Sequence, residues 1–289
     1  MTDAAAHMAA RRWMGRNKML TIGGILLAVP VLCALFAPLL APQDPSLQLL
    51  TARLRPPGFS TADFTFVLGT DGLGRDILSR LIYGARVSLI VGLTVVLIGG
   101  TVGTLVGLVS GYFGGIIDAL VMRIVDVFLA FPFLVLALVV MAITGPGLLN
   151  VILVLGFTSW VPYARVARAK VLGLKEREFI EASHALAARN ARVMFKHILP
   201  NIVSSIIVIA SSRVAIAIVS EATLSFLGLG VGAATPSWGA SLADGRTYLL
   251  IAWWPATLPG LAIMITVLGI NLIGDGLRDR LDPRLRSSS

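Results

Sequence analysis

Three groups of ionisable side chains in this 289-residue chain have a spacing that suggests chemistry. Asp71 and Asp76 form the first group, because two nearby carboxylates can act as general acid and base. Their loop contains no histidine, serine or metal-binding partner, so we expect both carboxylates to form a turn and to cap the next helix. In the second group, Asp118 and Asp126 flank Arg123, which predicts a local ion-pair cluster.

Arg213 and Glu221 form the third group, within an apolar run that extends from residue 202 to residue 230. A charge in hydrocarbon costs at least about 2.5–3.5 kcal/mol, so each side chain is expected to face protein or water. They are roughly 12 Å apart along a helix, too far to pair directly. Two interpretations remain open: a polar patch on a translocation pathway, or a hydrogen bond to a helix of a second subunit.

Other kinds of site are not supported by the sequence. The three histidines (His7, His184 and His197) form no HxxxH or HExxH pair, and the single cysteine, Cys33, excludes an internal disulfide. No lysine is followed by serine or threonine, so the phosphate-binding loop of an ATPase is absent. We therefore expect no catalytic residue, no metal site and no cofactor on this chain.

The composition predicts that these side chains are positioned by membrane-spanning helices. Hydrophobic residues make up 56% of the chain and charged residues only 13%, with a mean hydropathy of +0.88, whereas soluble domains carry roughly 25% charged residues. A spanning helix needs about 20 apolar residues, and six uncharged or nearly uncharged runs reach that length. The fold class is therefore all-α integral membrane, with spans expected near residues 20–41, 87–111, 123–143, 148–168, 202–228 and 249–275.

Small residues in the second span predict tight helix packing. Gly99, Gly103, Gly107 and Gly111 recur every four residues, which places them on one face of a helix. The expected structure is a closely packed bundle.

The basic residues predict the orientation of the chain. Six spans put both termini on one side, and that side then holds 17 of the Lys and Arg residues against six outside, with Arg213 within a span. The positive-inside rule makes this side cytoplasmic. The net charge of +9 is consequently attributed to topology and to contact with anionic lipid, and nucleic-acid binding is not expected.

Residues 161–201, between the fourth and fifth spans, have a basic, amphipathic pattern that predicts two short helices joined near Ala187–Asn190. Asn190 is a favourable N-cap for the second helix, and Pro200 favours a bend before the fifth span. Alanine adopts φ > 0 only at a cost, so the turn is expected to be helical at Ala187 or shifted toward Asn190. Taken alone, this segment could simply lie on lipid headgroups.

The same segment carries a motif. Glu181-Ala182-Ser183, followed by Leu186, Ala187 and the spaced pair Leu199-Pro200, resembles the EAA loop in the membrane subunits of bacterial ABC importers. Ser183 stands where that family has a second alanine, and Ala187 stands where it has glycine. The resemblance implies that Glu181, Ala182, Ser183, Leu186, Ala187, Leu199 and Pro200 dock an ATPase carried on another chain.

Further motifs extend the resemblance over nearly the whole chain, and they are similar to those of the dipeptide, oligopeptide and nickel permease family, C-type subunit. The family fold, the type I importer permease fold, implies a leader, first helix and outer loop at 1–83, a transmembrane domain at 84–276 with a coupling loop at 175–201, and a cytoplasmic tail at 277–289. The motifs are the stretches 36–42, 68–76, 81–89, 221–230, 236–239, 253–255 and 271–279.

This resemblance implies a multi-pass permease subunit in a bacterial inner membrane, with both termini cytoplasmic. Its expected partners are a related second permease subunit in a heterodimer, two cytosolic ATP-binding subunits or domains that hold ATP and Mg, and an extracytoplasmic solute-binding protein. The implied cargo is a dipeptide or an oligopeptide. The alternative is an ion-coupled secondary carrier that uses Arg213 and Glu221 as its relay.

Overall fold

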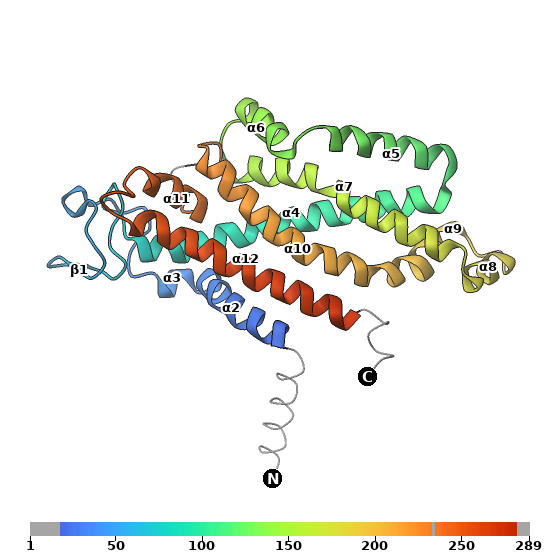
Figure 1. Cartoon of the computed structure of the whole chain (residues 1–289), viewed down its shortest axis with the longest axis horizontal. Helices are drawn as coiled ribbons and strands as arrows, with labels where there is room; N and C mark the ends of the chain where they lie inside the picture. Colours follow the sequence, from blue (N-terminus) through green and yellow to red (C-terminus); the bar gives the residue numbers. More distant parts are fainter. Residues whose placement is uncertain (1–17, 233–234, 282–289) are drawn as a thin grey trace, which may run out of the picture.

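The computed structural model describes residues 18–232 and 235–281, and every structural statement below concerns this part of the chain. The side chain of His184 is not described either. The arginines of the expected leader, and Arg284 and Arg286 of the tail, lie outside the described residues. Within them, the chain forms an elongated bundle of long helices with a small β-hairpin at one end (Figure 1).

Six segments cross the bundle along its long axis, and five of them are single helices long and apolar enough to span a membrane. The crossing elements are α2 (Lys18–Leu35), α4 (Ile77–Phe113), the pair α5 (Gly115–Ala130) and α6 (Phe133–Thr144), α7 (Leu148–Lys175), α10 (Leu199–Phe226) and α12 (Trp254–Leu281). The other elements are α3 (Ala37–Leu40), η1 (Leu50–Ala52), the antiparallel strands β1 (Phe59–Ser60) and β2 (Thr65–Phe66), α8 (Glu178–Ala185), α9 (Asn190–Arg192), the π-helical turn η2 (Val193–Ile198) and α11 (Trp238–Arg246).

The third crossing differs from the straight span expected near 123–143. α5 and α6 meet at an angle of 83°. Pro132 lacks an N–H and restricts the residue before it to extended conformations, and Phe131 accordingly has φ −96° and ψ 131°. The break therefore has a local cause in the sequence.

Close contact between α4 and α7 confirms the packing predicted from the glycine repeat. A Cβ at Gly103 would stand 2.2 Å from the carbonyl oxygen of Trp160, and one at Gly107 would stand 2.3 Å from that of Ala164. Gly99 and Gly111 face Ser159 and Val171 of the same helix. These glycines let the two backbones approach more closely than any other residue would allow.

The loop before α4 confirms the turn and cap predicted for its carboxylates. Asp76 caps α4 by accepting from the backbone N–H of Ser79 at 2.8 Å, and Asp71 accepts from the N–H of Arg75 at 2.9 Å. The structure adds an ion-pair network that the sequence did not predict. Arg75 bridges Asp71 and Asp244 at 2.6 and 2.7 Å, and thereby ties this loop to α11.

The ion pair of Asp118 was expected with Arg123, and this prediction is wrong. Asp118 receives two hydrogen bonds from the guanidinium of Arg168 on α7 and a third from Ser110 on α4. Arg123 and Asp126 are exposed and form no ion pair with any described residue. Since Arg168 is fifty residues away in sequence, the local charge pattern could not identify it.

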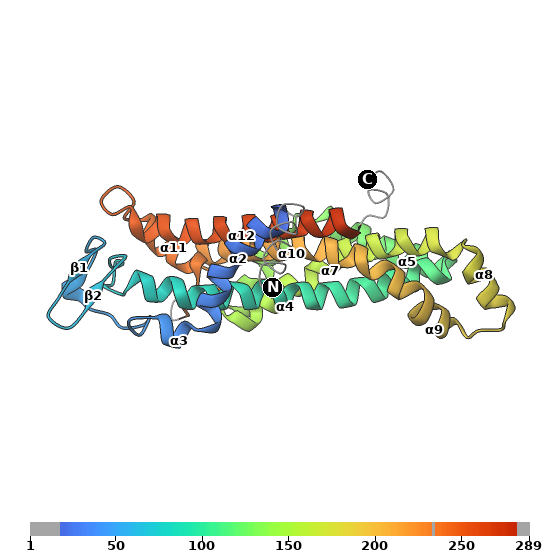
Figure 2. The same cartoon turned by 90° about the horizontal axis from the view of Figure 1, so that it is seen from below.

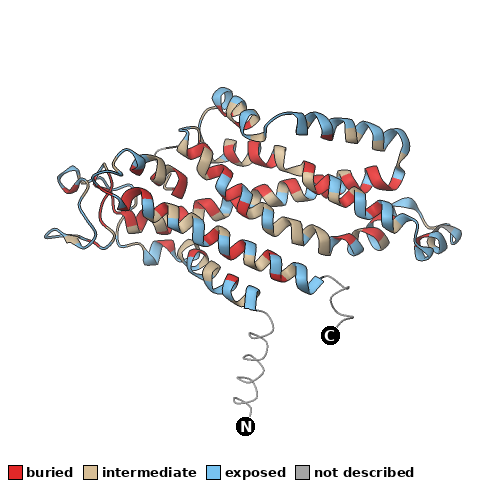
Figure 3. Cartoon of the chain, in the orientation of Figure 1, coloured by how far each residue is buried: buried red, intermediate tan, exposed pale blue. Residues whose placement is uncertain are grey.

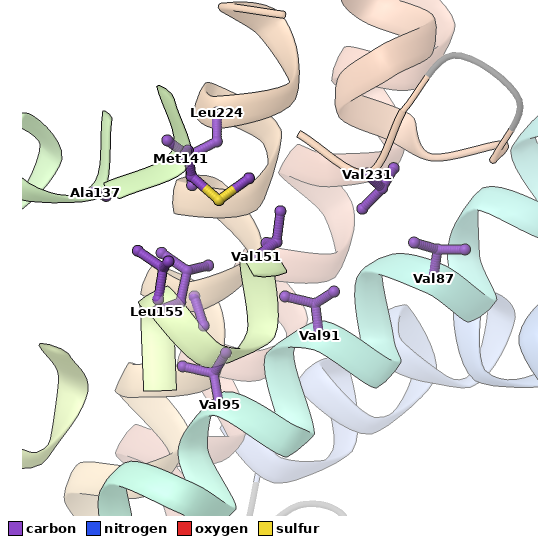
Figure 4. Close-up of a cluster of buried hydrophobic side chains, with 11 residues drawn as sticks. Val87, Val91, Val95, Ala137, Met141, Val151, Leu155, Leu224 and Val231 are labelled. Atoms are coloured by element: carbon purple, nitrogen blue, oxygen red, sulfur yellow. The ribbon is translucent and has the colours of Figure 1, made fainter. Parts of the chain in front are cut away.

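Buried side chains lie along the seams between the long helices, while α5 and most of α2 are exposed over their length (Figure 3). One core cluster joins α4, α6, α7 and α10 through residues that include Val91, Met141, Leu155 and Leu224 (Figure 4). The outward surfaces carry exposed apolar side chains such as Ile116 on α5 and Ile143 on α6. Such surfaces suit contact with lipid or with another membrane subunit.

The beginning of α2 and the end of α12 lie on the same side of the bundle, because the two helices pack antiparallel. A Cβ at Gly276 would stand 2.5 Å from the side chain of Leu20, and one at Gly23 would stand 2.7 Å from the carbonyl oxygen of Gly269. An even number of crossings also places the two ends of the chain on the same side of the bundle.

The seam between α4 and α7 leads to the first prediction. Gly107→Val should lower the stability of the purified chain by roughly 1–3 kcal/mol, because the added side chain must push the two helices apart. Thermal unfolding in detergent measures the effect. Gly173→Val on α7 is the matched control, since a Cβ at Gly173 meets nothing within 4 Å. Equal destabilisation by the two variants would contradict the packing argument.

Candidate functional site

The predicted coupling segment lies at the end of the bundle opposite the β-hairpin, where α8 and α9 project beyond the long helices (Figures 1 and 2). α7 ends at Lys175 and α8 begins at Glu178, so only two residues separate them. Glu178 and Glu181 occupy the first turn of α8, where negative charge is favourable for the helix dipole.

The inner face of this segment is fixed to the bundle. Ile180 of α8 and Val193 and Ile198 of η2 are fully buried against Leu108 of α4 and Val171 of α7. This apolar contact is formed within the chain, so it holds α8 against the bundle without a partner protein.

A polar bond joins the same region to the end of α4. The hydroxyl of Tyr112 donates to the side-chain oxygen of Asn190 at 2.9 Å. Asn190 is therefore not the N-cap expected from the sequence, because Arg189 occupies that position and Asn190 is the first residue of α9.

The outer face of the segment is small and largely apolar. Glu181, Ala182 and Ala187 are exposed, and the side chain of Leu186 is 84% exposed. Ser183 is half-buried, and its hydroxyl donates to the carbonyl oxygen of Phe179 at 2.8 Å.

Leu199 and Pro200 directly follow η2, at the start of α10. Leu199 packs against the buried cluster, whereas Pro200 is exposed. Of the seven predicted docking residues, Glu181, Ala182, Leu186 and Ala187 are thus presented at the projecting tip, and Leu199 contributes to its support.

The turn after α8 contradicts the expectation that Ala187 would avoid φ > 0. Ala187 has φ 53°. The N–H of Ala188 donates to the carbonyl oxygen of Ser183 at 3.1 Å, a six-residue closure typical of the Schellman motif, whose left-handed position glycine usually occupies. An alanine there costs roughly 1–2 kcal/mol, so the turn is formed in spite of local strain.

The expected bend at Pro200 is also absent. α9, η2 and α10 run as one helical segment over Asn190–Phe226. Pro200 lies in the first positions of α10, directly after the six π-helical residues Val193–Ile198. The missing N–H is tolerated there, and the wider turn accommodates the proline within a continuous helix.

The two ionisable residues of α10 have different surroundings. Glu221 is fully buried (0% exposed) and accepts from the hydroxyls of Ser225 at 2.8 Å and of Ser88 on α4 at 3.5 Å. It joins α10 to α4 within this chain. The sequence suggested that Glu221 could form a hydrogen bond to a helix of a second subunit. In the structure Glu221 forms its hydrogen bonds with serines of its own chain.

Arg213 is half-buried and lines a cavity of about 460 Å³. The walls come from α4, the break between α5 and α6, α7 and α10, and they include Phe128, Phe131, Thr158 and Ser159. Arg213 is the one charged residue among those that line it, and it forms no ion pair with a described residue. The aromatic side chains that line this cavity were not predicted. The third span was expected to be straight, so the residues on either side of Pro132 were not placed beside Arg213.

No cluster of three or more His, Cys, Asp or Glu residues that could hold a metal ion occurs in residues 18–232 and 235–281.

Family comparisons extend over nearly the whole chain. The family described as "Binding-protein-dependent transport system inner membrane component" matches residues 103–287, and the "N-terminal TM domain of oligopeptide transport permease C" matches residues 7–57. A dipeptide transport system permease protein DppC from Escherichia coli strain K12 is 50% identical, with 94% of this chain and 91% of that protein covered.

Two further similarities agree with that match. A di/tripeptide transport system permease protein DppC from Pseudomonas aeruginosa is 46% identical over 93% of this chain and 89% of that protein. Among solved structures, an inward-facing MetNI methionine ABC transporter has a TM-score of 0.59 at 21% identity, covering 71% of this chain and 98% of that chain. At this level of identity the structural similarity shows the fold.

The strained turn leads to the second prediction. Ala187→Gly should slow amide hydrogen exchange across residues 183–190, because it relieves up to about 1 kcal/mol of strain at a left-handed position. Ala182→Gly inside α8 is the control and should accelerate exchange, since glycine is unfavourable in a helix interior. Faster exchange in both variants would contradict the interpretation of the Ala187 turn.

Proposed function

The chain belongs to the family of inner-membrane components of binding-protein-dependent transport systems, as a permease subunit of an ABC importer, and we propose that its cargo is a small peptide. The substrate class follows from relatives at 46–50% identity whose names specify dipeptide or di/tripeptide transport. The chain would form one half of the translocation pathway, and a related permease subunit would form the other half in a heterodimer.

ATP hydrolysis would be carried by two cytosolic subunits or domains, which would hold ATP and Mg. The observation that carries this proposal is the projecting tip of α8, with an inner face buried in the bundle and an outer face of small and apolar side chains. A rigidly supported helix with exposed Leu186 fits a groove on a partner protein. Glu181 would meet a basic group in that groove.

The rival function, an ion-coupled carrier, requires Glu221 and Arg213 to act as a relay. Glu221 is enclosed by serines of its own chain and does not line the cavity that contains Arg213. A secondary carrier also has no need of a projecting docking helix. The importer is therefore the better-supported function.

The proposed orientation places α8 in the cytoplasm and the β-hairpin outside, where an extracytoplasmic binding protein would deliver the peptide. Both termini would then be cytoplasmic, because the beginning of α2 and the end of α12 share one side of the bundle with α8.

Thiol labelling tests this orientation and gives the third prediction. In a Cys33→Ala background, Ser60→Cys and Leu250→Cys should react with an impermeant thiol reagent added to spheroplasts, and Leu186→Cys should not. All three native side chains are exposed, so protection reports the side of the membrane. Permeabilised cells that lack the ATPase subunits provide the control, because every variant should react there once no partner can cover Leu186→Cys. Labelling of Leu186→Cys in intact spheroplasts would reverse the orientation and remove the proposed ATPase docking.

Docking gives the fourth prediction. Ala182→Trp should overfill the groove of the ATPase and weaken assembly by roughly 1–3 kcal/mol, which is about 5- to 150-fold in Kd. Glu181→Lys should also reduce assembly, because it reverses the local charge. Co-purification with the ATPase subunits and ATP-dependent peptide uptake in proteoliposomes measure the effect.

Ala62→Trp is the matched control for this substitution, because Ala62 is exposed between β1 and β2 at the opposite end of the bundle. It should assemble and transport normally. Wild-type assembly and uptake by the Ala182→Trp complex would overturn the assignment of α8 as the docking helix.

A further inference from the structure

The cavity beside the break between α5 and α6 has the features of an intramembrane binding site. Its volume of about 460 Å³ lies within the range of small-molecule sites. Arg213 is near the middle of α10, roughly 20 Å from either end of the helix. The cavity therefore lies at the depth where a transported solute must pass.

An arginine at this depth is costly unless an anion or water meets it. The buried arginines have carboxylate partners: Arg75 bonds Asp71 and Asp244, and Arg80 lies 3.8 and 3.9 Å from the same two carboxylates. The half-buried Arg168 bonds Asp118. For Arg213 no carboxylate partner exists among the described residues, although it is half-buried. Its unused donors face a space that an anionic ligand can enter.

A second group near Arg213 also lacks a partner. The hydroxyl of Tyr163 on α7 is buried and forms no hydrogen bond with any described residue. It lies within electrostatic range of the Arg213 guanidinium. Tyr163 is fully buried and is not among the residues that line the cavity, so the guanidinium of Arg213 is the group that can meet a carboxylate there.

The remaining walls are neutral. Phe128, Phe131 and Phe133 provide an apolar surface, and the residues that line the cavity include no aspartate or glutamate. The site can therefore hold an anionic end group and varied side chains, but it has no group that would pair with an ammonium.

We propose that Arg213 binds the C-terminal carboxylate of the peptide during its passage through the membrane. This inference rests on the proposed function. The carboxylate is the anionic group that all unmodified peptides share, so one arginine serves peptides of any sequence. The N-terminal ammonium has no partner in the cavity and is not recognised there.

The test is transport of three forms of one dipeptide by the whole complex in proteoliposomes: the free peptide, its C-terminal amide and its N-acetyl derivative. The rate for each form is measured at saturating binding protein, and the variant-to-wild-type ratio is then taken so that the selectivity of the binding protein cancels. Arg213→Gln should reduce transport of the free and N-acetyl peptides by about 10- to 100-fold and leave the amide unchanged. Arg213→Lys should retain part of the transport rate for the free and N-acetyl peptides.

Arg123→Gln is the matched control, because Arg123 is an exposed arginine of α5 outside the cavity. It should transport all three forms at the wild-type rate. Assembly of every complex is checked by size-exclusion chromatography.

Several outcomes would overturn the proposal. One is an equal loss of transport for the free peptide and its C-terminal amide in Arg213→Gln. The others are unchanged transport by the assembled Arg213→Gln complex and a loss of transport for the N-acetyl peptide alone. Failure of Arg213→Gln to assemble would instead assign the guanidinium to a carboxylate of the second permease subunit. In each case, ATP-dependent uptake by the wild-type complex would leave the importer function intact. A wild-type complex that transports none of the three forms would refute the peptide-importer function itself.

Discussion

The close approach of α4 and α7 is the contact on which the other parts of this bundle depend. Four glycines of α4 face the backbone and small side chains of α7, so the helices can pack without large side chains between them. One end of this seam supports α8 through Ile180 and Val193, and its middle forms two walls of the cavity that contains Arg213. The docking segment and the cavity are thus positioned by the same pair of helices.

Charge placement is the second constraint. Asp71, Arg75 and Asp244 form a bonded network near the N-terminal end of α4, and Asp118 pairs with Arg168 near its C-terminal end. Between them, Glu221 is enclosed by serine hydroxyls. Each arrangement reduces the cost of taking a charge out of water. Against this background, an arginine that faces an apolar cavity is the exception, and the binding proposal follows from that contrast.

Much of the fold could be predicted from the sequence, because lipid imposes a length and a polarity on each crossing. All six crossings, the Asp76 cap and the glycine seam were expected, and the structure contains them. The departures have local causes. Phe131-Pro132 breaks the third crossing, and the residues Val193–Ile198 absorb Pro200 in a π-helical turn. Both prolines are visible in the sequence, but their effect depends on the helices packed around them.

The candidate site was less predictable than the fold. The tip residues were identified by a motif, whereas Arg168, which bonds Asp118, and Ser88, which bonds Glu221, lie 50 and 133 residues away from them in sequence. The left-handed Ala187 contradicts local propensity, because the Schellman closure and the anchoring of α8 and η2 select the turn. Tertiary contacts of this kind outweigh a local cost of roughly 1–2 kcal/mol, and no single-residue preference reveals them.

The continuity of the segment Asn190–Phe226 gives the tip and the cavity a mechanical connection. It begins beside α8, passes Arg213 near its middle and reaches Glu221, which is bonded to Ser88 of α4. A displacement of α8 would therefore be carried along one helix to the side chain that faces the cavity. The π-helical turn η2 is the irregular part of the segment Asn190–Phe226. A displacement of α8 can be absorbed or transmitted at this turn. In the proposed docking mode, a displacement of α8 would reach this segment through the contact of Ile180 with the buried cluster around Val193, and would then pass along one helix to the cavity.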